Sequence, residues 1–224
     1  PDLLSFDMGG TTAKGALIRD GRPLRRYEFE VAREYGFKHG SGLPLRIPVI
    51  DMIEIGAGGG SIATVDERNL LAVGPSSAGA DPGPACYGKG GTEPTVTDAH
   101  VVLGRIDPDF FLGGRVKLDR SAARNAVDTI ARALDLAVEE AALAIIETVN
   151  DNMAIDVRRI TIERGLDYRD FDLIAFGGAG PLHAGALTSM LAMKDCLIPP
   201  TPGVLSAYGL LNANIEVEQG ESFL

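Results

Sequence analysis

The stretch FDMGGTTAKGALI, close to the start of the chain, joins an acidic side chain to a short turn rich in glycine and threonine. Asp7 ends an apolar run typical of a buried strand, and it is followed by Gly9, Gly10, Thr11 and Thr12. Glycines let backbone N–H groups come close to an anion, and threonine hydroxyls add donors. A carboxylate at a strand end can hold Mg²⁺ or Mn²⁺ through water. These residues therefore predict a phosphate site with a metal ion held by Asp7, although a plain hairpin turn is the alternative.

A second glycine-rich turn lies far downstream, in FDLIAFGGAGPLHA. It connects an apolar strand pattern to a helix pattern in which Pro181 suits the first turn. The unpaired N–H groups at the start of a helix face any ligand above it. Three glycines exceed what a simple connection needs, so we predict that ligand contacts are made by Gly177, Gly178 and Gly180.

Two further glycine-rich segments depart from the phosphate-binding motifs that they approach. GPACYGKG, over residues 83–90, matches the Gly-x4-Gly-Lys loop until Gly90 replaces the required Ser or Thr. No strand pattern precedes this segment, and the GTEP after it does not favour a helix. GAGGGS, over residues 56–61, has Ser61 where the dinucleotide pattern needs a third glycine. We therefore expect neither a P-loop nor a bound dinucleotide.

Two pairs of polar residues have uncertain roles from sequence alone. Asp51 and Glu54 are three apart on a predicted strand, so their side chains lie on opposite faces unless the strand breaks. Asp98 and His100 are two apart and could converge on a metal ion. Neither pair identifies a site by itself.

Other residues also allow a functional and a structural interpretation. Lys14 shares a strand face with Thr12 and could reach a phosphate, or it could simply be exposed. His183 could contact a ligand, but a packed or capping histidine is the commoner case. Cys86 has no histidine nearby in sequence, which favours a buried thiol. The polar run at residues 150–152 indicates a helix face toward solvent or a polar cleft.

The composition argues against several classes of partner. The formal net charge of −10 disfavours nucleic acid and anionic membranes, because both need clustered Lys and Arg. No apolar stretch reaches the roughly 20 residues that span a bilayer. The first residues show no secretory signal pattern, and the 2 cysteines form no disulfide framework. We expect a cytoplasmic protein with a small-molecule substrate and no nucleic-acid or membrane partner.

The order of the predicted elements indicates an α/β layered fold. Helices are expected over residues 120–134, with Asp119 as N-cap, over 138–164, and from Pro181 onward. Residues 34–48 read as a loop, and SIATV and LLAVG read as a hairpin. The other expected strands are LLSFDM, AKGALI, PLRRYEFEV, FDLIAF and DCLIP.

Longer stretches carry a resemblance to a known family. FDMGGTTAKGALI, EIGAGGGSIA, VGPSSAGADPGPACYGKGGTEPTVTDAHVVLGRI and AFGGAGPLHAGAL…PPTPGVLSAYGL are similar to the hydantoinase A/oxoprolinase family over nearly the whole chain. The Asp-x-Gly-Gly-Thr turn with a distant strand-Gly-Gly-helix unit also resembles the actin, hexokinase and chaperone ATPases. The resemblance implies a ribonuclease H-like α/β half-domain with a mixed sheet, flanking helices and a Gly/Pro-rich insertion at residues 34–105.

The resemblance also implies an activity and a division of roles. Family members open cyclic amides of the hydantoin or 5-oxoproline type with ATP, or form subunits of acetone and acetophenone carboxylases. Asp7 would be the catalytic residue, residues 9–12 the second phosphate loop, and residues 177–180 the adenosine loop, with ATP and Mg²⁺ or Mn²⁺ as cofactors. The expected function is ATP-dependent hydrolysis of a cyclic amide, and a ketone carboxylase subunit is the alternative.

The same resemblance implies that residues 1–224 are one half of an ATPase. Only one Asp-x-Gly-Gly-Thr turn occurs in the sequence, so the first phosphate loop has no counterpart. We therefore expect a piece of a longer chain that works with a missing first half and a large hydantoinase B-type subunit or region. The isolated piece is expected to be inactive, and it could serve only as a binding or assembly domain.

Overall fold

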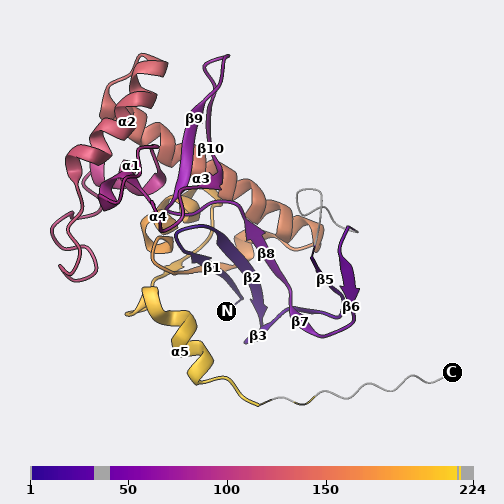
Figure 1. The fold of residues 1–224 in the computed structure, drawn as a ribbon. Helices are drawn as coiled ribbons and strands as arrows, with labels where there is room; N and C mark the ends of the chain where they lie inside the picture. The colour runs from indigo at the N-terminus through magenta and orange to yellow at the C-terminus, as the bar shows by residue number, and fades with distance from the viewer. Residues whose placement is uncertain (1, 33–40, 216, 218–224) are drawn as a thin grey trace.

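The computed structural model describes residues 2–32, 41–215 and 217 (Figure 1). Its centre is a mixed sheet in the order β12-β11-β1-β2-β3, with β8 also paired to β2. β1 runs antiparallel to β2 and parallel to β11, so β1 and β11 end at the same edge. The strands of this sheet are β1 (Leu3–Met8), β2 (Ala13–Arg19), β3 (Arg22–Pro23), β8 (Met52–Ile55), β11 (Asp172–Phe176) and β12 (Cys196–Leu197).

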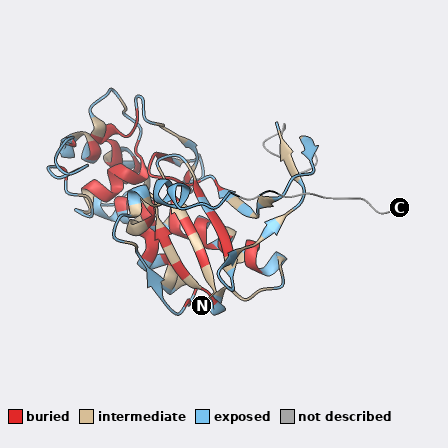
Figure 2. Ribbon diagram, turned by 90° about the horizontal axis from the view of Figure 1, so that it is seen from below, coloured by how far each residue is buried: buried red, intermediate tan, exposed pale blue. Residues whose placement is uncertain are grey.

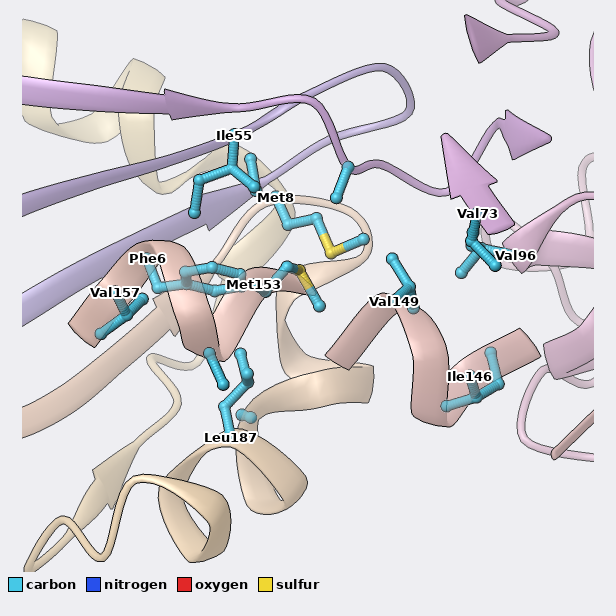
Figure 3. Packing of buried hydrophobic residues seen from close by; sticks show 14 of the residues in the cluster. Phe6, Met8, Ile55, Val73, Val96, Ile146, Val149, Met153, Val157 and Leu187 are labelled. Carbon is cyan, nitrogen blue, oxygen red and sulfur yellow. The ribbon is translucent and has the colours of Figure 1, made fainter. Parts of the chain in front are cut away.

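Two helices, α3 (Val138–Glu163) and α4 (Gly180–Met190), pack on one face of the sheet (Figure 1). β1 buries every second side chain, and the side chains of Phe6 and Met8 meet Met153 of α3 and Leu187 of α4 (Figure 3). Burying side chains of this size stabilises a fold by about 1.5–3 kcal/mol each. Figure 2 shows the resulting buried layer between the sheet and the helices. This layer fixes the strand ends from which the glycine turns start.

Helix α3 follows its predicted pattern closely. The side chains expected to face the core are all buried: Ala142, Ile146, Val149, Met153, Val157 and Ile160. At its start, the Glu140 carboxylate accepts a hydrogen bond from the Ala137 N–H at 2.9 Å. The chain leaves the helix through Gly165, whose φ is +67°, a backbone conformation that glycine adopts without strain.

A smaller lobe is built from the hairpin β9 (Ser61–Val65) and β10 (Leu71–Ser77) with α1 (Val96–Val102) and α2 (Arg120–Leu134) (Figure 1). The hairpin and α2 were predicted, and Asp119 caps α2 by accepting from the Ala122 N–H at 2.9 Å. The sequence analysis missed α1. Its start is fixed by a capping box in which Thr95 and Asp98 each bond the other's backbone N–H. The short helix η1 (Ala85–Tyr87) packs beside it.

The predicted strand PLRRYEFEV is wrong as a single element. It is divided into β3, β4 (Arg25–Arg26) and β5 (Phe29–Val31), because each part pairs with a different strand. β4 pairs with β7 (Val49–Ile50) and β5 with β6 (Leu43–Leu45). The predicted loop at 34–48 therefore contains a short strand, and its residues 34–40 lie outside the described residues.

The remaining elements are short. They are η2 (Tyr168–Asp170), η3 (Pro202–Val204) and α5 (Leu205–Leu211). α5 was not predicted and has no buried residue. Among the described residues, no helix combines the length and apolar character that a membrane crossing requires. The α/β arrangement with a mixed sheet and flanking helices agrees with the sequence-based expectation.

Candidate functional site

Three glycine-rich segments meet at the edge where β1 and β11 end. The β1–β2 turn holds residues 9–12, the β11–α4 turn holds residues 177–179, and the β8–β9 connection holds residues 58–60. The Gly59 N–H donates to the Gly9 carbonyl at 3.0 Å, and the Gly60 N–H donates to the Gly10 carbonyl at 2.6 Å. The Ala179 N–H donates to the Met8 carbonyl at 2.9 Å. Main-chain hydrogen bonds thus bring together segments that are far apart in sequence.

The segment GAGGGS, residues 56–61, packs against the β1–β2 turn and supports it. Gly58, Gly59 and Gly60 are buried, and a Cβ on Gly58 would lie 2.5 Å from the carbonyl carbon of Thr11. The Gly59 carbonyl accepts from the Thr97 hydroxyl at 2.7 Å, which ties the segment to the first turn of α1. The segment does not match the dinucleotide pattern, and in the structure close packing requires its glycines instead.

The two adjacent glycines of the β11–α4 turn differ in their surroundings. Gly177 has φ +84°, and a Cβ there would lie 2.4 Å from both the Asp7 Oδ1 and the Met8 carbonyl oxygen. Gly178 is exposed, and a Cβ there would meet nothing within 4 Å. A Cβ on Gly180 would make ordinary contact, 3.5 Å from the Phe6 carbonyl. Gly177 is therefore required by the fold, whereas Gly178 borders open space.

Asp7 is half-buried at the end of β1, next to Gly177. Its Oδ2 accepts a hydrogen bond from the Ser206 hydroxyl at 2.9 Å. Lys14 lies opposite Asp7 across β1 and β2, with its Nζ 4.0 Å from Glu54. The Lys14 side chain is exposed. Sequence analysis gave Ser206 no role, although it lies in the family-like stretch PPTPGVLSAYGL.

The site offers donors to an anion. In the part of the chain that the structure describes, the N–H groups of Gly10, Thr11 and Gly178 donate no hydrogen bond. Thr11 is exposed and Thr12 is half-buried, so only one of them is fully open to a ligand. Free N–H groups beside open space are what phosphate oxygens need.

The donor set also limits the kind of metal that fits. Residues 2–32, 41–215 and 217 contain no group of three or more His, Cys, Asp or Glu side chains placed to hold a metal ion. A cage made by the protein alone is therefore not available there. One carboxylate, Asp7, fits Mg²⁺, which binds proteins through one or two carboxylates together with substrate phosphates and water.

A buried cluster of His100, His183 and Asn150 lies inside the protein, away from solvent. His183 Nδ1 is 2.7 Å from the Asn150 Oδ1, and its Nε2 is 3.2 Å from the His100 Nε2. An amide oxygen only accepts hydrogen bonds, so His183 Nδ1 carries a proton and donates it to Asn150. The Nε2 of the neutral His183 ring then accepts from His100 Nε2. The other nitrogen of His100, Nδ1, has no partner among the described residues and carries no proton. Burial lowers the pKa of His183 to about 4 and that of His100 to about 3. Both rings are therefore neutral near pH 7, and His183 is a packed residue.

The other candidate polar residues have structural partners. Asp51 accepts from the Arg164 Nε at 2.7 Å, which links the start of β8 to the end of α3. The Asp98 carboxylate accepts from the backbone N–H groups of Ala85 and Cys86 and from Thr95, while His100 points to His183. Asp98 and His100 thus bond to different partners. Cys86 is buried, and this burial, with Asp98 nearby, raises the pKa of its thiol.

An open cleft of about 450 Å³ lies between β10 and α3. Thr148, Asn152 and Asp156 line its α3 side. Asn152 donates to the Val73 carbonyl at 3.3 Å, so it faces a polar cleft as the sequence predicts. Asn150 does not, because it is buried against His183. The residues predicted to bind a ligand, Asp7, residues 9–12 and residues 177–180, do not line this cleft.

Comparison with known proteins identifies the family. The family model described as Hydantoinase/oxoprolinase matches residues 1–219. The chain belongs to this family. It is 48% identical over 225 residues to an uncharacterized protein of Methanocaldococcus jannaschii, with 99% of this chain and 33% of that protein covered. It is 42% identical over 219 residues to caprolactamase subunit alpha of Pseudomonas jessenii, with 97% of this chain and 30% of that subunit covered.

Two solved structures share the fold of this family member. Nucleotide-free acetone carboxylase superposes with a TM-score of 0.82 at 33% identity, covering 93% of this chain and 28% of that one. The ATP-dependent caprolactamase from Pseudomonas jessenii superposes with a TM-score of 0.78 at 43% identity, covering 93% and 29%. The predicted family and the predicted α/β ATPase fold class are confirmed. The hydantoinase/oxoprolinase chain described here spans about a third of the length of these relatives.

Proposed function

We propose that the protein containing this chain uses ATP to activate the carbonyl oxygen of a small molecule, and that the substrate is a cyclic amide. The observation that carries this proposal is the meeting of the two glycine turns at Asp7, with free N–H groups and open space at Gly178. Family membership supports it, because relatives include a caprolactamase and a 5-oxoprolinase.

In the proposed reaction the γ-phosphoryl group of ATP passes to the amide oxygen, and ADP leaves. Water then adds to the activated carbonyl carbon, and the ring C–N bond breaks as the nitrogen takes a proton, which leaves an acyl phosphate. A second water hydrolyses the acyl phosphate to the carboxylate and inorganic phosphate. Phosphoryl transfer depends mainly on positioning and on neutralising charge. Mg²⁺, when bound, supplies part of that neutralisation.

The roles proposed for the residues follow from their places. Asp7 orients the phosphoryl group and would hold Mg²⁺ through water, and its position at the end of β1 lets it do so without disrupting the core. The turn N–H groups of Gly10, Thr11 and Thr12 hold phosphate oxygens. Gly9, whose N–H donates to the Thr12 carbonyl at 3.1 Å, shapes this turn. Gly178 leaves room for the adenine and ribose, and Gly177 and Gly180 keep the turn close to β1.

A complete nucleotide cleft requires more of the protein. We propose that residues 1–224 form the second half of the ATPase, with residues 34–105 as an insertion, and that a further segment supplies the first phosphate loop. The short span of this chain along its relatives supports this division. The name caprolactamase subunit alpha implies a further subunit in that enzyme, which supports our proposal that this protein works with a large hydantoinase B-type subunit or region. We place the assembled protein in the cytoplasm.

Carboxylation of a ketone is the second candidate. Superposition on acetone carboxylase gives the higher TM-score, 0.82 against 0.78 for caprolactamase, which favours this alternative. Sequence identity favours the lactam enzyme, at 43% against 33%. Both reactions use the same phosphoryl activation of a carbonyl oxygen.

The test is ATP hydrolysis by the whole protein with its partner subunit, measured with 5-oxoproline, hydantoins and lactams, and with ketones plus bicarbonate. We expect a cyclic amide to stimulate hydrolysis. Asp7→Ala should lower the stimulated rate by more than about tenfold, which is about 1.4 kcal/mol of barrier, without changing the fold. Stimulation by ketones alone would select carboxylation, and no stimulation by any of them would refute phosphoryl activation.

A further inference from the structure

A segment that follows β12 touches both glycine turns of the candidate site. The Ser206 hydroxyl donates to the Asp7 Oδ2 at 2.9 Å, across 199 residues of sequence. The Pro202 carbonyl accepts from the Gly177 N–H at 2.9 Å. Residues 202–206 therefore contact the carboxylate of one turn and the backbone of the other.

Core packing does not explain why Ser206 lies beside Asp7. Ser206 is on the first turn of α5, and no side chain of α5 is buried. Large apolar side chains of this helix are exposed, including Tyr208 and Leu211. Within the described residues, α5 contacts chiefly the adjoining η3, and η3 contacts β11. The polar contact to Asp7 is thus the specific feature of this residue's position.

Both oxygens of the Asp7 carboxylate are restricted. Oδ1 lies so close to Gly177 that a Cβ there would be 2.4 Å away, and Oδ2 is bonded to Ser206. A carboxylate at a strand end otherwise rotates about its last torsion, which has a broad minimum. A hydroxyl that donates to one oxygen fixes this rotation and so fixes the direction of the remaining lone pairs.

We propose that Ser206 is a positioning residue that holds the Asp7 carboxylate in one orientation for phosphoryl transfer. This inference rests on the function proposed above. It adds residues 202–206 to the three glycine-rich segments of the site. Because Ser206 acts through Asp7, it affects the rate of the chemical step more than the binding of ATP.

The experiment uses the whole protein with its partner subunit and three variants, Ser206→Ala, Ser206→Thr and Tyr208→Phe. Each is shown to be folded by circular dichroism, and kcat and KM for ATP are measured with the stimulating substrate. We expect Ser206→Ala to lower kcat by about tenfold to a hundredfold, the usual cost of losing an orienting partner, with KM for ATP changed less than about threefold. Ser206→Thr keeps the hydroxyl and should recover most of the rate. Tyr208→Phe deletes a hydroxyl from the same helix and should leave both constants unchanged.

A second measurement separates a positioning role from a structural one. The stimulated kcat is measured in wild type, Ser206→Ala, Asp7→Ala and the double variant. The rate loss caused by Ser206→Ala should vanish when Asp7 is already Ala, because the hydroxyl then has no partner.

The outcomes are distinguishable. An active wild type with an equally active Ser206→Ala overturns the positioning role and leaves the proposed function standing. A rate loss that Ser206→Thr does not recover, or that Tyr208→Phe reproduces, assigns the effect to α5 as a whole and also overturns it. A wild type that hydrolyses no ATP with any substrate overturns the proposed function and, with it, the role of Ser206.

Discussion

An alanine at Gly177 should destabilise the protein, whereas an alanine at the adjacent Gly178 should not. In Gly177→Ala the new Cβ would lie 2.4 Å from the Met8 carbonyl oxygen and from the Asp7 Oδ1. Met8 belongs to a central strand of the sheet, so its backbone cannot move aside without breaking pairs with β2. The residue also has φ +84°, where an alanine is strained.

The cost of Gly177→Ala can be estimated from these two effects. Left-handed strain contributes about 1–2 kcal/mol, and overpacking against fixed atoms contributes about 1–3 kcal/mol. A central value of about 3 kcal/mol corresponds to a Tm lowered by about 6–12 °C for a domain of this size. Thermal unfolding of the whole protein, followed by circular dichroism, measures this loss.

Gly178→Ala is the matched control. Its Cβ would meet no atom within 4 Å and its φ is not positive, so we expect a Tm within about 2 °C of wild type. A Gly177→Ala protein that is equally stable would refute the packing argument for this turn.

The open space at Gly178 leads to a binding expectation. A larger side chain there, in Gly178→Val, should weaken binding of a non-hydrolysable ATP analogue by at least about tenfold, or about 1.4 kcal/mol, because it occupies the space proposed for adenosine. Calorimetric titration of the whole protein measures the affinity. Unchanged affinity in a folded variant would mean that the nucleotide does not lie over this turn.

Three further predictions follow from the structure. Gly58→Ala would place a Cβ 2.5 Å from the Thr11 backbone and should destabilise the protein by about 1–3 kcal/mol. Gly185→Ala is the control, because a Cβ at this position of α4 would meet no atom within 4 Å. Equal urea midpoints for the two variants would contradict the packing argument for Gly58. Burial lowers the pKa of His183 to about 4 and that of His100 to about 3. From pH 6.5 down to 4 the unfolded state therefore binds protons that the folded state does not, and stability should fall by on the order of 3 kcal/mol for each histidine. A urea midpoint that is constant between pH 7 and 4.5 would exclude this effect. Isolated residues 1–224 should show no substrate-stimulated ATP hydrolysis, and robust turnover that Asp7→Asn abolishes would disprove the half-site interpretation.

Local patterns predicted those elements whose residues carry their own signal. β1 and α3 follow apolar periodicities of two and of three to four residues, and both were placed within a residue of their bounds. Asp119 and Gly165 were identified as helix ends because N-caps and left-handed glycines depend on nearby backbone only. The fold class followed from the order of these elements.

Features that depend on distant partners were not predictable from one sequence. The division of PLRRYEFEV into three strands depends on which strand pairs with each part. The support that residues 58–60 give to the first turn is a main-chain contact across about 50 residues, and it leaves no side-chain signal. The Ser206 hydroxyl and the Asp7 carboxylate also meet across 199 residues, in a side-chain contact that neither local pattern indicates. By contrast, α1 had a readable signal, the Thr95-x-x-Asp98 capping box, which the surrounding glycines and prolines obscured.

The three turns hold one another through peptide N–H and C=O groups, and the N–H groups of Gly10, Thr11 and Gly178 that are left over belong to exposed residues. Peptide groups are chemically the same in every member of a family, so nothing in these turns distinguishes a lactam from a ketone. If the site works as proposed, the step that consumes ATP and the choice of what is activated are encoded in separate parts of the polypeptide. Evolution of a new substrate could then proceed by exchanging residues elsewhere while these turns stay constant. Sequence differences between lactam-opening and ketone-carboxylating relatives should therefore concentrate outside residues 9–12, 58–60 and 177–180.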